Sequence, residues 1–168
     1  PIDPIAVSRI EVLRGPAALL FGGNAVGGVV NAISNRIPRS AELGNAALAN
    51  VGIESVDRSR SIAARLDGVR ESWALHLDGT HRESENVRTP RFTLPDGEVR
   101  DRIENSAART RSGAIGLSRL WQGGFVGASV DSYNNRYGIV ATDGVTIEMR
   151  REKVMIEGET TLTHSPFA

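Results

Sequence analysis

The chain contains 168 residues, of which 20 are basic, 20 are acidic and none is cysteine. The balanced charge gives no overall field that would attract nucleic acid or an anionic surface. The absence of cysteine excludes a disulfide framework and a thiolate metal site. No apolar run approaches the roughly 18 residues that a membrane-spanning helix needs.

The first organised stretch is RIEVLRGPAALLFGGNAVGGVVNAIS, residues 9–34, which has five glycines and no lysine. The stretch has no lysine after its last glycine, which a P-loop requires. No two of its glycines are two residues apart, as a dinucleotide-binding loop requires. The apolar residues instead predict two strands, around 10–13 and 29–33. A turn at Gly15-Pro16 and a helical turn over 17–21 would join them. We expect a tight strand–turn–strand unit rather than a phosphate site.

From about residue 41 onward, apolar and polar residues alternate with the period of a β-strand. The alternation predicts six strands, over 43–54, 58–68, 72–83, 107–121, 124–137 and 146–159. Short turns at 68–71 and 122–124 alternate with long connections at 84–106 and 138–145. The charge-rich segment 84–106 is predicted to form no regular element, because it has little apolar surface to bury. Long strands with unequal connections favour a transmembrane antiparallel barrel, and a β-sandwich remains the alternative.

The same alternation predicts which side chains share a face of the sheet. One face should carry Ile62, Leu66, Leu75, Leu77, Ile115 and Leu117, and the other Arg65, His76, Asp78 and Thr80. Trp73, Trp121 and Phe125 flank the short turns. They are predicted to form an aromatic girdle at one edge of the sheet.

The opening stretch closely resembles the end of the plug domain of TonB-dependent outer-membrane receptors. The matching residues are Arg9 to Val12, Arg14 to Pro16, Leu20 to Gly22 and Gly27 to Asn31, with Phe21 where Tyr is commoner and Val30 where Ile is commoner. Residues 125–139 and 151–159 resemble the fifth and sixth strands of a subgroup that includes zinc-type receptors. The resemblance implies that residues 1–40 are the C-terminal part of a plug domain. Residues 41–168 would be about the first six strands of the barrel.

The resemblance therefore implies an all-β fold: a partial transmembrane antiparallel β-barrel preceded by the C-terminal part of a plug domain. It implies active, energy-coupled uptake of a ferric siderophore or another metal complex. The partners would be TonB, which would bind an N-terminal segment absent here, and outer-membrane lipid; no nucleic acid and no cofactor are expected. The plug–barrel contact is expected to involve Arg9, Arg14, Gly15, Pro16, Gly22, Gly27, Gly28 and Asn31. Arg14 in particular would pair with carboxylates on the inner barrel wall.

The histidines do not predict a metal site or a catalytic site. His76 and His81 are five residues apart on one predicted strand and therefore point to opposite faces. His76 shares a face with Asp78, but no nucleophile motif accompanies the pair, so we expect no enzyme. Two other classes remain open: a passive pore or adhesin barrel, and a soluble all-β binding module.

Overall fold

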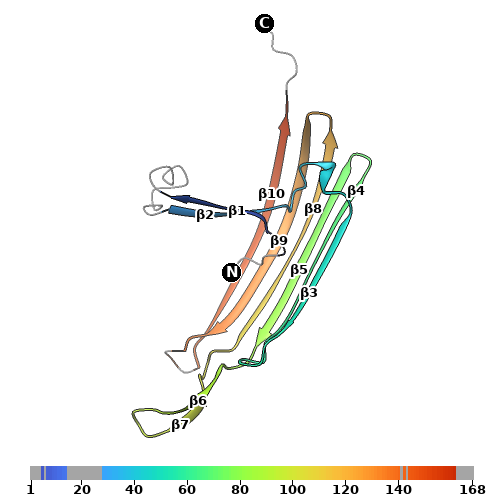
Figure 1. The fold of residues 1–168 in the computed structure, drawn as a ribbon. Helices are drawn as coiled ribbons and strands as arrows, with labels where there is room; N and C mark the ends of the chain where they lie inside the picture. Colours follow the sequence, from blue (N-terminus) through green and yellow to red (C-terminus); the bar gives the residue numbers. More distant parts are fainter. Residues whose placement is uncertain (1–4, 6, 15–27, 141, 143, 162–168) are drawn as a thin grey trace.

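The computed structural model describes residue 5 and residues 7–14, 28–140, 142 and 144–161 (Figure 1). Its first element is an antiparallel hairpin of β1 (Val7–Arg14) and β2 (Gly28–Ser34). This hairpin confirms the two strands expected in the glycine-rich stretch. The turn at Gly15-Pro16 and the helical turn over 17–21 lie outside the described residues.

The main sheet has six antiparallel strands in the spatial order β10-β9-β8-β5-β4-β3. They are β3 (Ala46–Ile53), β4 (Arg60–Arg70), β5 (Trp73–Ser84), β8 (Ala108–Trp121), β9 (Gly124–Gly138) and β10 (Thr146–Thr160). The six-stranded meander predicted from the alternation is confirmed. A short 3-10 helix, η3 (Ala41–Leu43), precedes β3. None of the helical structure among the described residues is long and apolar enough to cross a membrane.

The two faces of the sheet have opposite character. Directly opposed residues of antiparallel strands share a face, and Leu77 lies opposite both Leu66 and Ile115. The neighbouring position, Asp78, lies opposite Arg65 on the other face. The predicted division of side chains between the faces is therefore confirmed. We call the face that carries Leu77 the outer face and the face that carries Asp78 the inner face.

The long connection between β5 and β8 contains a hairpin, so the prediction of no regular element over 84–106 is wrong. The hairpin consists of β6 (Arg88–Thr93) and β7 (Val99–Arg102). Its turn is closed by a 2.8 Å hydrogen bond from the Leu94 amide to the Glu98 carbonyl. Gly97 supplies the positive φ of 91° that the turn needs. The turn sequence Pro-Asp-Gly was thus a stronger local signal than the low apolar content.

The hairpin is also braced by charge at its tip. A hydrogen bond from Arg100 Nη2 to Glu98 Oε2, 2.8 Å long, holds the pKa of the Glu98 carboxyl below its ordinary value. This exposed pair adds little stability by itself, and the turn remains the main local determinant of the ribbon.

The predicted aromatic girdle is only partly present. Trp73 and Trp121 lie on the outer face near the short turns and are about half exposed, at 44% and 45%. Phe125 lies opposite Leu120 on the inner face and is buried, so its place in the girdle was wrong. Because successive strand residues alternate in direction, proximity to the same turn did not put Phe125 beside Trp121.

Within the described part of the chain, β3 and β10 each pair with one strand, and the sheet is not closed. The molecule is therefore all-β: an incomplete antiparallel barrel wall preceded by a hairpin. The small core lies on the inner face, where Ile37 packs with Ala74, Leu120 and Phe125.

Candidate functional site

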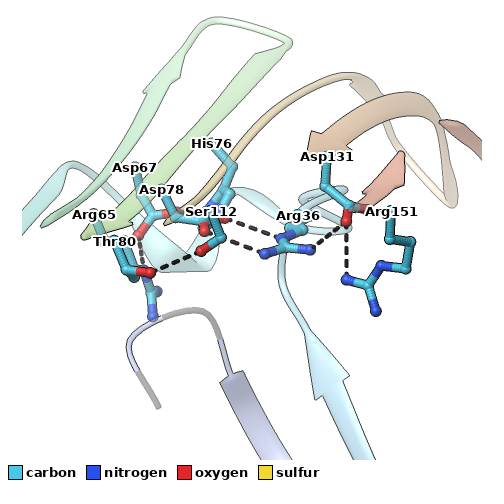
Figure 2. Close-up of polar contacts among 9 residues, drawn as sticks. All are labelled: Arg36, Arg65, Asp67, His76, Asp78, Thr80, Ser112, Asp131 and Arg151. Atoms are coloured by element: carbon cyan, nitrogen blue, oxygen red, sulfur yellow. Dashed lines mark hydrogen bonds and ion pairs between the residues drawn. The ribbon is translucent and has the colours of Figure 1, made fainter. Parts of the chain in front are cut away.

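The segment between the β1–β2 hairpin and the sheet, residues 35–40, crosses the inner face; we call it the connector. Arg36 of the connector contacts carboxylates on two strands of the sheet (Figure 2). Its Nε and Nη2 lie 3.0 and 3.3 Å from the two carboxylate oxygens of Asp78 on β5. Its Nη1 lies 3.2 Å from Oδ1 of Asp131 on β9. One guanidinium therefore links the connector to strands that are not neighbours in the sheet.

The backbone of the connector is seated on the sheet by two glycines. A Cβ at Gly116 of β8 would overlap the carbonyl oxygen of Arg36, and one at Gly127 of β9 would lie 2.6 Å from Cγ2 of Ile37. Glycine allows this close approach because it has no side chain. Ile37 itself is 3% exposed. The connector is thus held by an ion pair, by close backbone contact and by a buried apolar side chain.

A second group of charges is linked to Arg36 through Asp78. His76 is fully buried, with Nδ1 2.7 Å from Asp67 Oδ1 and Nε2 3.1 Å from Asp78 Oδ2. Arg65 Nε contacts the second oxygen of Asp67 at 2.6 Å. Both imidazole nitrogens therefore face carboxylate acceptors, an arrangement in which a doubly protonated ring satisfies both contacts.

Asp131 is shared by the connector and the wall. In addition to its ion pair with Arg36, Asp131 Oδ1 accepts a 3.2 Å hydrogen bond from Nη2 of Arg151 on β10. The Arg151 guanidinium also lies over the Tyr133 ring, 5.6 Å from its centroid. Buried carboxylates are stable only when paired. Each of the three buried aspartates in this group, Asp67, Asp78 and Asp131, has at least one arginine partner.

These contacts make an electrostatic attachment. Thr80 and Ser112, the hydroxyls drawn beside the charges in Figure 2, hydrogen-bond to each other at 2.8 Å. Among the residues that the structure describes, no group of three or more histidine, aspartate or glutamate side chains is arranged to hold a metal ion. The geometry is suited to fixing one chain segment against another.

Four of the expected contact residues lie in the described hairpin. Arg9 forms an ion pair of 2.8 Å with Glu11, and Asn31 Nδ2 donates to Glu11 Oε2 at 3.3 Å. Arg14 is exposed at the end of β1, where it pairs in register with Gly28. The described contacts of Arg9 and Asn31 thus lie within the hairpin. The other four expected residues, Gly15, Pro16, Gly22 and Gly27, lie outside the described residues.

The sequence analysis missed Arg36. It expected an arginine on the wall carboxylates but chose Arg14, which lies before the two glycine pairs rather than after them. The signal that could have found Arg36 is the set of aspartates at inward positions of the strands. Asp67, Asp78 and Asp131 each interrupt a face that must bury its side chains. They need a cation, and Arg36 is the first basic residue after the glycine-rich stretch.

Comparison with known proteins supports the resemblance of the opening stretch. Residues 1–29 match the family model described as TonB-dependent Receptor Plug Domain. A hemin receptor of Yersinia pestis is 62% identical over 29 residues, which are 17% of this chain and 4% of that receptor.

Similarity also extends into the sheet. A ferrioxamine receptor of Yersinia enterocolitica is 28% identical over 123 residues, or 72% of this chain and 14% of that receptor. A rhizobactin receptor of Rhizobium meliloti (strain 1021) is 36% identical over 81 residues, or 45% of this chain and 11% of that receptor. The matches therefore span only a small part of the length of these relatives.

Proposed function

We propose that this chain, which carries the end of a TonB-dependent receptor plug domain and the antiparallel strands after it, belongs to an outer-membrane receptor for energy-coupled nutrient uptake. Residues 1–40 would be the C-terminal part of the plug, and 41–168 would begin the barrel wall. The inner face of the sheet would then line the barrel lumen, and the connector would be the passage from plug to wall.

The attachment of Arg36 to Asp78 and Asp131 is the observation that carries this proposal. A receptor that is opened by a pull from TonB needs a plug that is held against the wall at rest. The guanidinium supplies three charge-assisted contacts to two strands, and such contacts are directional and strong in a partly buried site. A passive pore does not require a plug segment attached to its wall.

The outer face is suited to contact with lipid. Its two central cross-strand rows carry Leu66, Leu75, Leu77, Ile115, Leu117, Val130, Val154 and Ile156. Several of these side chains are half exposed or more; Val154 and Ile156 reach 70% and 76%. Such a band of apolar side chains would face lipid in a transmembrane barrel, with Trp73 and Trp121 at one boundary.

The substrate class is proposed from the relatives. Their names refer to hemin, ferrioxamine, enterobactin and rhizobactin receptors. We propose a ferric siderophore or a similar metal complex as the cargo, with TonB as the energy-coupling partner.

An uptake assay tests the proposal. The complete receptor that contains this segment is expressed in cells lacking their own siderophore receptors, and uptake of iron-55 bound to each candidate siderophore is measured with and without TonB. We expect uptake of at least one complex that depends on TonB. Uptake that persists without TonB would indicate a passive pore. A receptor that stays soluble without detergent would indicate a binding module.

A further inference from the structure

The outer face changes character beyond its apolar rows, at the end of the sheet away from the tryptophans. Here it carries four exposed arginines on three neighbouring strands: Arg109 and Arg111 on β8, Arg136 on β9 and Arg150 on β10. We call these residues the arginine cluster. The cluster lies near the long connections, at the same end of the sheet as the β6–β7 hairpin (Figure 1).

The strand register brings these like charges together. Arg109 lies directly opposite Arg136. In the next row, Asn134 has Arg111 on one side and Arg150 on the other, so both are diagonal neighbours of Arg136. Like charges placed directly opposite each other destabilise a sheet. Pairing of the strands alone therefore gives no reason for this arrangement.

The protein's own carboxylates neutralise only part of the cluster. Arg109 pairs with Glu83, and Arg150 pairs with Glu152. Glu148, which lies opposite Arg136 in register, instead accepts a hydrogen bond from Asn134 at 3.2 Å. Within the described ranges, neither Arg111 nor Arg136 has a carboxylate at ion-pair distance, and Arg111 acts on Glu83 only through a longer-range electrostatic interaction. Neither cation is held in an ion pair of its own, so both can contact an external anion.

The position of the cluster indicates where that anion comes from. Arg111 and Trp121 are ten residues apart on β8. This separation is about 33 Å along a strand, and about 25 Å along the membrane normal at a tilt of about 40°. The apolar band of a transmembrane barrel has about this height. If Trp121 lies at one lipid–water boundary, Arg111 lies at the other, on the side of the long loops.

We propose that the arginine cluster binds the phosphate groups of lipid headgroups in the outer leaflet, with Arg111 and Arg136 as its main contacts. This proposal rests on the membrane placement in the proposed function, and it adds a lipid site that uptake itself does not require. Arginine suits this role because its planar guanidinium binds phosphate through two parallel hydrogen bonds.

The test uses the complete receptor, purified in a neutral detergent and titrated with phosphatidic acid or phosphatidylcholine; bound lipid is counted by native mass spectrometry. The variant is Arg111→Gln with Arg136→Gln. The matched control, Arg88→Gln with Arg91→Gln, removes two exposed arginines from the β6–β7 hairpin. We expect the wild type and the control to prefer phosphatidic acid. The cluster variant should bind phosphatidic acid at least about tenfold more weakly, since each surface arginine contributes about fivefold to binding an anionic lipid.

Equal binding of the two lipids by the wild type would overturn the proposal, and so would an unchanged preference in the cluster variant. TonB-dependent uptake is measured on the same variants and should be retained in the cluster variant. Phosphatidic acid binding by a wild-type receptor that shows no TonB-dependent uptake would contradict the proposed function and leave the lipid site supported.

Discussion

Arg36 shows how one cation can hold the connector against the inner face of the sheet. Its side chain is 16% exposed, and both of its aspartate partners are nearly buried. The guanidinium fits Asp78 through two nitrogens and still reaches Asp131 with the third. A lysine ammonium is a compact point charge and could not span both carboxylates in the same way.

We predict that Arg36→Ala loosens the plug in the complete receptor. Removing one partner of a buried pair costs about 3 kcal/mol, because the remaining carboxylates are left uncompensated. Cells carrying the variant should admit a small antibiotic that the outer membrane normally excludes, and Arg36→Lys should give an intermediate effect. Arg39→Ala is the comparison, since Arg39 also pairs the connector with the wall, at Glu157 of β10, but is much more exposed, at 56%, and should hold the plug less strongly. Antibiotic sensitivity equal to that of Arg39→Ala would show that Arg36 does not hold the plug.

Gly116 offers a test of the backbone contact that is independent of charge. Gly116→Ala would push a methyl group into the Arg36 carbonyl oxygen, whereas a Cβ at Gly113 on the same strand would meet its nearest atom at an ordinary 3.6 Å. We expect Gly116→Ala to increase leakage of the same antibiotic, and Gly113→Ala to leave it unchanged. Similar leakage from both variants would mean that β8 tolerates neither substitution and that the close contact is not the cause.

His76 and His81 lie on opposite faces of β5 and form a second matched pair. His76→Phe keeps a ring between Asp67 and Asp78 but removes the two ring nitrogens that contact them, so two buried carboxylates lose a partner. His81 is partly exposed on the outer face. We expect His76→Phe to lower the free energy of unfolding of the complete receptor by about 2 kcal/mol, and His81→Phe to change it little. Denaturant unfolding in lipid vesicles, followed by tryptophan fluorescence, measures both.

The strands could be predicted because their inward and outward positions differ in chemistry. Leu75, Leu77, Ile115 and Leu117 alternate with His76, Asp78 and the small residues of β8, so the register had one consistent solution. The β6–β7 hairpin and the burial of Phe125 could not be read from that pattern. The hairpin depends on a local turn, and Phe125 is buried by contact with Ile37, which is distant in sequence.

The candidate site could be predicted only in outline. A plug arginine meeting wall carboxylates was expected from the resemblance, but the choice of Arg36 depends on where the connector crosses β8 and β9. Gly116 and Gly127 determine that crossing. In the sequence, these two glycines look like any other small residue of an alternating strand. The pattern therefore did not show that the connector would cross the sheet at these positions.

The division of the sheet into two faces predicts which side chains meet lipid. In the complete receptor, spin labels at Leu75 and Leu117 should respond to a lipid-soluble relaxation agent. A label at Asn50, which shares the inner face with Ala63 and Thr80, should respond to a water-soluble agent instead. The reverse pattern would contradict the assignment of the outer face. Electron paramagnetic resonance measures all three positions.

The six strands form a wall that needs further partners. In the part of the chain described here, β3 and β10 each have a neighbour on one side, so each leaves backbone N–H and C=O groups unpaired along its other edge. Lipid cannot satisfy these groups. Closure by additional strands would pair both edges.

We therefore predict that residues 1–168 alone do not form a stable membrane-inserted monomer, whereas the complete receptor does. Each unpaired backbone group in hydrocarbon costs several kcal/mol, and two open edges present many of them. The two proteins are refolded in parallel into lipid vesicles and compared by gel migration with and without boiling, because a closed barrel migrates differently until it is heated. The complete receptor should show this shift. Chain 1–168 should be aggregated or remain accessible to added protease along β3 and β10. A heat-sensitive, protease-resistant monomer of residues 1–168 would show that the open edges are satisfied within this chain and that the wall is complete without further strands.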